Sequence, residues 1–181
     1  MSNKKANNWA KFGIPAIVAV RLTLPFFLWK NPLVVWGLIV VVVDWFDGDI
    51  FRKAFNYQKN NVYQLFDKVL DFYGYCFALV FSMPSPIFSA LLFFFLLRAV
   101  GLIIFLIKKE RKIFAFFPNV FENLFIAYIL TLTFPSLTFL LEGYYFYATL
   151  LVLTVVTLVR EYFLHIKEIQ PHELLTGKRW V

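Results

Sequence analysis

The chain has 181 residues, of which 61% are hydrophobic and only 16% are charged, and its mean hydropathy is +0.71. Soluble domains carry about a quarter charged residues, so this composition excludes a soluble single-core domain and predicts an all-α polytopic membrane protein. The net charge of +7 does not indicate nucleic-acid binding, because the basic residues lie between apolar stretches and do not form one soluble face. Cys76 is the single cysteine, which excludes an intrachain disulfide.

Apolar stretches of about 20 residues recur along the chain and predict one membrane domain, residues 1–181, with six transmembrane helices. Residues 1–11 are too polar to span and predict a short interfacial segment, and residues 165–181 predict a cytoplasmic tail that carries His165 and His172 on its surface. The predicted spans lie at about 12–29, 33–52, 62–82, 87–107, 113 or 118 to 140, and 144–164.

Lysine and arginine residues predict the orientation. Of the 18, three precede the first span, four lie at 52–68, four at 108–112 and four from 160 onward, while the opposite side receives only Lys30. The positive-inside rule therefore places both termini on the cytoplasmic side of a multi-pass protein of the cytoplasmic membrane.

Arg21 and Arg98 lie inside predicted spans, where a charge requires an anionic partner. For Arg21 the sequence leaves three interpretations open: the side chain reaches out to the membrane surface, contacts phosphate, or pairs with the aspartates. For Arg98 we expect a buried pair with Glu122, with recognition of a polar acceptor as the alternative.

All five aspartates lie within residues 44–71. Asp44 and Asp47 are spaced i,i+3, and Asp67 and Asp71 are spaced i,i+4, so on helices each pair shares a face. A carboxylate at the edge of a bilayer costs on the order of 3 kcal/mol, so four of them require positive charge. Two divalent cations, Mg²⁺ or Mn²⁺, would supply it, because such cations prefer oxygen ligands.

The same stretch resembles the signature of the CDP-alcohol phosphotransferase family, D-x2-D-G-x2-A-R-x8-G-x3-D-x3-D. Six spans, with the motif at the cytoplasmic ends of the second and third, extend the resemblance over most of the chain. The family's Ala is Phe51 here, its second Gly is Tyr63, and the spacer is two residues longer. The stretch reads Asp44-x2-Asp47-Gly48-x2-Phe51-Arg52-x10-Tyr63-x3-Asp67-x3-Asp71.

The resemblance implies a transferase that moves a phosphatidyl-type group from a CDP-linked lipid donor to a polar alcohol and releases CMP. We expect glycerol 3-phosphate as the acceptor, a role in phospholipid biosynthesis, and a homodimer. The resemblance also implies that Asp71 is the general base and that Gly48 and Arg52 bind CDP. Arg21 and Arg98 are candidates for contacts to phosphate or to the acceptor. Two Mg²⁺ or Mn²⁺ ions would be held by Asp44, Asp47, Asp67 and Asp71.

Two other functions stay open. Phe51 and Tyr63 are bulky where the family has small residues, so they would close the nucleotide pocket of a non-catalytic member that still binds metal. Alternatively, the carboxylates would line a cation pathway, since intramembrane acids often do so.

Overall fold

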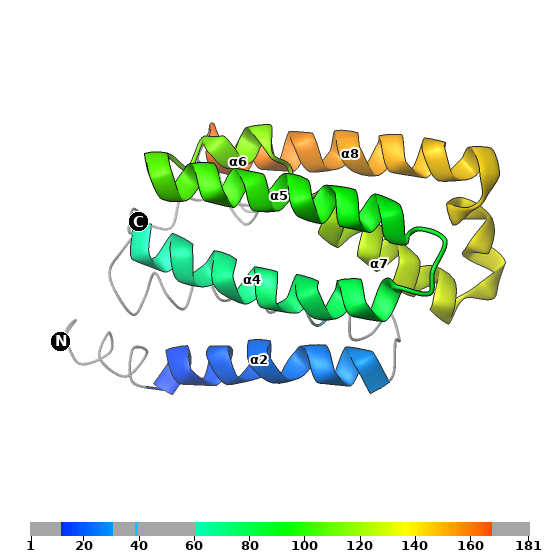
Figure 1. Ribbon diagram of the computed structural model, residues 1–181, viewed down its shortest axis with the longest axis horizontal. Helices are drawn as coiled ribbons and strands as arrows, with labels where there is room; N and C mark the ends of the chain where they lie inside the picture. Colours follow the sequence, from blue (N-terminus) through cyan, green and yellow to red (C-terminus); the bar gives the residue numbers. More distant parts are fainter. Residues whose placement is uncertain (1–11, 31–38, 40–60, 168–181) are drawn as a thin grey trace, which may run out of the picture. The chain divides into compact units, whose positions relative to one another are not determined.

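The computed structural model describes residues 12–30, 39 and 61–167, and the regular elements in this part are all helical, which confirms the all-α prediction there (Figure 1). The predicted span at 33–52 lies outside the described residues. The helices are α2 (Ile14–Lys30), α4 (Asn61–Ser82), α5 (Phe88–Lys108), α6 (Ile113–Phe116), α7 (Val120–Thr133), the 3-10 helix η2 (Pro135–Leu141) and α8 (Gly143–His165).

The chain forms two compact units, one of Met1–Pro84 with Leu132–Phe134 and one of Ser85–Thr131 with Pro135–Val181. In the first unit, α2 and α4 lie side by side and run in the same direction (Figure 1). The second unit holds α5, α6, most of α7, η2 and α8, in which α6 packs against both α5 and α8.

Aromatic and polar contacts set the position of α2 along α4. The rings of Phe26 and Phe77 meet edge to face at 4.9 Å, and the Tyr73 hydroxyl donates to the carbonyl of Leu22 at 3.1 Å. Pro25 lies inside α2 and supplies no backbone N–H there. These contacts hold the second half of α2 against the second half of α4.

The second unit is built around apolar side chains of α5, α6 and α7. Phe105 and Phe114 are almost fully buried and their ring centroids lie 5.0 Å apart. A Cβ added at Gly101 would lie only 2.5 Å from Cβ of Phe117, so α5 and the link between α6 and α7 approach closely at this glycine.

Two described helices, α5 and α8, are long and apolar enough by length and composition to cross a membrane. They match the predicted fourth and sixth spans within one residue at each end. The stretch predicted as the fifth span, from 113 or 118 to 140, is divided into α6, α7 and η2. Pro118 and Pro135 explain the breaks, since proline cannot donate to a helix and disfavours helical backbone in the preceding residue.

Candidate functional site

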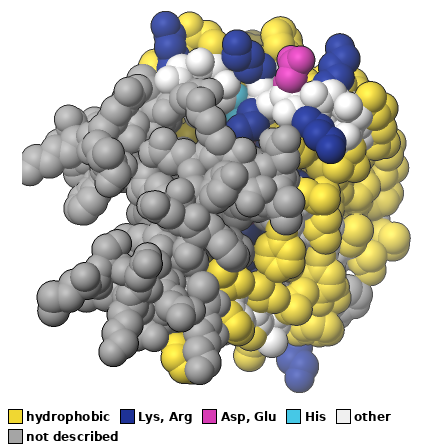
Figure 2. Space-filling view, turned by 90° about the vertical axis from the view of Figure 1, so that its left-hand side faces the viewer, with side chains coloured by type: hydrophobic (Ala, Val, Ile, Leu, Met, Phe, Trp, Pro, Cys, Tyr) yellow, Lys and Arg dark blue, Asp and Glu magenta, His cyan; other side chains and the backbone are white. Residues whose placement is uncertain are grey.

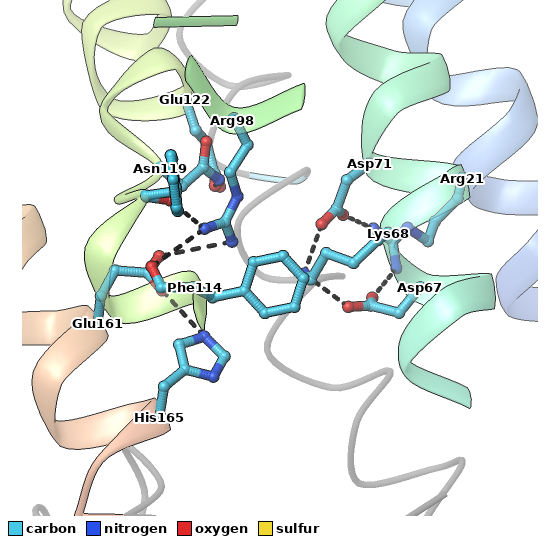
Figure 3. A network of polar contacts seen from close by, with 11 residues as sticks. Arg21, Asp67, Lys68, Asp71, Arg98, Phe114, Asn119, Glu122, Glu161 and His165 are labelled. Carbon is cyan, nitrogen blue, oxygen red and sulfur yellow. Dashed lines mark hydrogen bonds and ion pairs between the residues drawn. The ribbon is translucent and has the colours of Figure 1, made fainter. Parts of the chain in front are cut away.

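Two aspartates and two basic side chains meet between α2 and α4, and we call them the Arg21 cluster: Arg21, Asp67, Lys68 and Asp71 (Figure 3). The two aspartates are one turn apart on α4, so both carboxylates lie on the face toward α2. Arg21 donates from Nη1 to Oδ1 of Asp67 at 2.8 Å, and its Nη2 bonds Oδ1 of Asp71. One guanidinium from α2 therefore joins the two carboxylates of α4.

Lys68 contacts the remaining oxygens of the same carboxylates. Its Nζ lies 2.8 Å from Oδ2 of Asp67 and 2.7 Å from Oδ2 of Asp71. All four carboxylate oxygens thus contact a cation, and two positive charges balance two negative ones. The four side chains are only 9% to 13% exposed, so water contributes little and the pairing itself must offset desolvation.

Of the three interpretations that the sequence leaves open for Arg21, the structure shows a pairing with aspartates. The other residues that the resemblance assigns to metal and nucleotide lie outside the described residues, as does Phe51. Tyr63 lies in the first turn of α4. The four residues assigned to metal and nucleotide that lie outside the described residues are Asp44, Asp47, Gly48 and Arg52.

A second buried ion cluster lies in the other unit, and we call it the Arg98 cluster: Arg98, Phe114, Glu161 and His165 (Figure 3). Nη1 of Arg98 donates to the carbonyl of Phe117 at 2.6 Å, and its guanidinium lies 4.6 Å from the ring centroid of Phe114. Nη2 of Arg98 is 3.8 Å from Oε1 of Glu161, while Nε2 of His165 is 2.9 Å from Oε2 of that residue.

This arrangement corrects two predictions. Arg98 forms its ion pair with Glu161 of α8 and not with Glu122, which accepts a hydrogen bond from Asn119 at 2.7 Å. His165 is buried, not exposed on a tail, because α8 continues to this residue and places it one turn after Glu161. The sequence carries a signal for the pair of Arg98 and Glu161. Glu161 is an acid inside a predicted apolar span, and such an acid needs a partner.

The carboxylates of the Arg21 cluster have the chemistry of a site for a hard divalent cation. In the structure the Lys68 Nζ lies between Asp67 and Asp71, within 2.8 Å of one oxygen of each. Carboxylate oxygens are the ligands that Mg²⁺ and Mn²⁺ prefer. Among the described residues no group of three or more His, Cys, Asp or Glu could hold a metal ion.

The chain matches no protein-family model, no curated protein and no solved structure. The two ion clusters and the sequence motif are therefore the features of the chain that point to a function.

Proposed function

We propose that the chain is a membrane transferase of the CDP-alcohol phosphotransferase type. It would transfer a phosphatidyl-type group from a CDP-linked lipid to a polar alcohol, with glycerol 3-phosphate as the first acceptor to test, and release CMP. The observation that supports this proposal is the convergence of the Asp67 and Asp71 carboxylates on shared cations within the motif. In the motif these two residues supply half of the expected metal ligands.

The proposal places the chain in the cytoplasmic membrane with six spans and its active site on the cytoplasmic side. The lengths and compositions of α5 and α8 support this location. The common direction of α2 and α4 also agrees with their assignment as first and third spans, because alternate spans run the same way (Figure 1).

Mg²⁺ or Mn²⁺ would be held by Asp67 and Asp71 together with Asp44 and Asp47, and would stabilise the negative charge of the diphosphate. Arg21 would keep both described carboxylates turned toward the site, since it bonds one oxygen of each. The carboxylate of Asp71 would accept the proton of the acceptor hydroxyl. Contacts to the CDP group would come from Gly48 and Arg52.

The test is CMP release by the full chain in nanodiscs with CDP-diacylglycerol, Mg²⁺ or Mn²⁺ and a panel of polar alcohols. Asp71→Asn should lower the rate by about 10²- to 10⁴-fold, the usual contribution of a general base, while CDP binding persists. Glu142→Gln is the matched control, because it removes an exposed carboxylate before α8 and should leave the rate unchanged. Equal rates for Asp71→Asn and the native chain would contradict the assignment of the base.

One observation favours a second candidate, a non-catalytic protein in which the cluster is structural. All four oxygens of Asp67 and Asp71 already contact Arg21 or Lys68, so this part of the motif is neutral without metal. Such a protein would release no CMP with any acceptor, would not bind CDP, and would unfold at the same temperature with and without Mg²⁺.

A further inference from the structure

The turn between α5 and α6 concentrates positive charge on the surface of the second unit. Residues 108–112 carry four basic side chains and one acidic side chain, which leaves a net charge of +3. The three lysines are exposed, and within the described part of the chain none of the four basic side chains forms an ion pair. In Figure 2, basic side chains gather around an acidic one at the upper edge of the face that the figure draws. We call residues 108–112 the basic turn: Lys108, Lys109, Glu110, Arg111 and Lys112.

The backbone of the basic turn is held in place by hydrogen bonds. Lys109 has a left-handed backbone with φ of 56°, and its N–H donates to the carbonyl of Phe105 at 2.6 Å. Farther along, the N–H of Ile113 donates to the backbone carbonyl of Glu110 at 3.2 Å, and the N–H of Phe114 donates to the backbone carbonyl of Arg111 at 3.1 Å.

The apolar side chains on either side of the turn anchor it as well. Phe105, Ile113 and Phe114 form a buried core beneath it. A surface held in this way loses little backbone entropy when it binds a partner.

Exposed apolar side chains flank the basic turn on both sides. Ile107, before it, is 76% exposed, and Phe116, after it, is 74% exposed. The turn also follows directly from the end of α5, a helix long and apolar enough to cross a membrane. A helix of that kind brings its end to the level of the lipid headgroups.

We propose that the basic turn binds the headgroups of anionic phospholipids, with Ile107 and Phe116 inserted at the boundary between headgroups and acyl chains. Lysine and arginine donate charge-assisted hydrogen bonds to phosphate oxygens, and basic clusters next to a span attract anionic lipids. The exposed apolar flanks favour a lipid over a free phosphate, because only a lipid surface would cover them. The proposal requires α5 to lie in a bilayer but does not depend on transferase activity.

The experiment measures lipid selectivity of the full chain in detergent by native mass spectrometry. The protein is titrated with equal amounts of phosphatidylglycerol and phosphatidylcholine that carry the same acyl chains, and the ratio of the two bound lipids is recorded. The native chain should bind phosphatidylglycerol preferentially. Lys108→Gln should lower this preference roughly fivefold, the effect expected for one basic side chain near an anionic surface.

Two further variants separate this site from a general effect of net charge. Lys30→Gln is the matched control, because Lys30 is likewise an exposed last residue of a helix, and it should leave the ratio unchanged. Glu110→Gln should raise the preference for phosphatidylglycerol, because it removes the one negative charge of the basic turn. A misfolded protein would not show such a rise. The proposal is overturned if Lys108→Gln keeps the native ratio, if Lys30→Gln lowers it equally, or if excess inorganic phosphate abolishes the preference.

Discussion

Replacing Arg21 with methionine tests how much the Arg21 cluster stabilises the packing of α2 on α4. Methionine keeps an unbranched apolar side chain of similar reach but removes the guanidinium that bonds Asp67 and Asp71. Two carboxylates would then share only Lys68, which leaves one uncompensated negative charge in side chains that are about 10% exposed.

The expected loss follows from that charge imbalance. Removing one partner of a buried ion pair costs about 3–5 kcal/mol, and the lower end applies because Lys68 still bonds both carboxylates. For a chain of this length 1 kcal/mol shifts Tm by roughly 2–4 °C, so Arg21→Met should lower Tm by roughly 6–12 °C. The assay is thermal unfolding in detergent with EDTA, followed by circular dichroism.

Lys30→Met provides the control, since it removes one positive charge from an exposed position at the end of the same helix. Its Tm should stay near that of the native chain. Mg²⁺ should restore much of the loss in Arg21→Met if the aspartates bind metal, because a ligand at about 100 times its Kd stabilises by about 2.7 kcal/mol. A native Tm for Arg21→Met would refute the idea that the cluster holds the two helices together.

Two predictions concern the second unit and use the same thermal assay. Gly101→Ala should destabilise by about 1–3 kcal/mol, because its Cβ would lie 2.5 Å from Phe117. Its control is Gly74→Ala, in α4 of the first unit, which should be neutral or stabilising, since nothing lies within 4 Å of the added Cβ. Glu161→Leu should cost about 3–5 kcal/mol by leaving Arg98 buried without its carboxylate. Adding Arg98→Met should recover part of that loss, and an unchanged or larger loss in the double variant would contradict the pairing.

Hydropathy alone predicted the long helices of the second unit well. The stretches at 87–107 and 144–164 became α5 and α8 with ends shifted by one residue, because uninterrupted apolar runs of this length form helices in nearly any apolar environment. The division of the fifth predicted span into shorter helices has a local cause that hydropathy does not detect. Pro118 and Pro135 interrupt the span, and an average over a window of residues gives two prolines little weight.

The candidate site was predicted in part. The i,i+4 spacing of Asp67 and Asp71 correctly indicated a shared face. The cost of burying carboxylates indicated nearby positive charge, which the sequence assigned to two divalent cations and which Arg21 and Lys68 supply in the structure. The partner of Arg98 could not be chosen from spacing, because Glu122 and Glu161 lie on different helices. Which acid faces Arg98 depends on how α7 and α8 pack against α5, and that is decided by tertiary contacts.

The two candidate functions differ most clearly in what Lys68 must do. Its Nζ contacts Oδ2 of Asp67 and Oδ2 of Asp71, so a divalent cation held by these aspartates would compete with Lys68 for them. A lysine side chain is a single charge on a flexible stem and can leave such a position, whereas the planar guanidinium of Arg21 is matched to the two remaining oxygens. In a transferase, Lys68 would release the aspartates to the metal, whereas in a structural ion cluster it would keep its contacts with both. In both cases Arg21 would stay a counter-ion of Asp67 and Asp71, because it bonds one oxygen of each across α2 and α4.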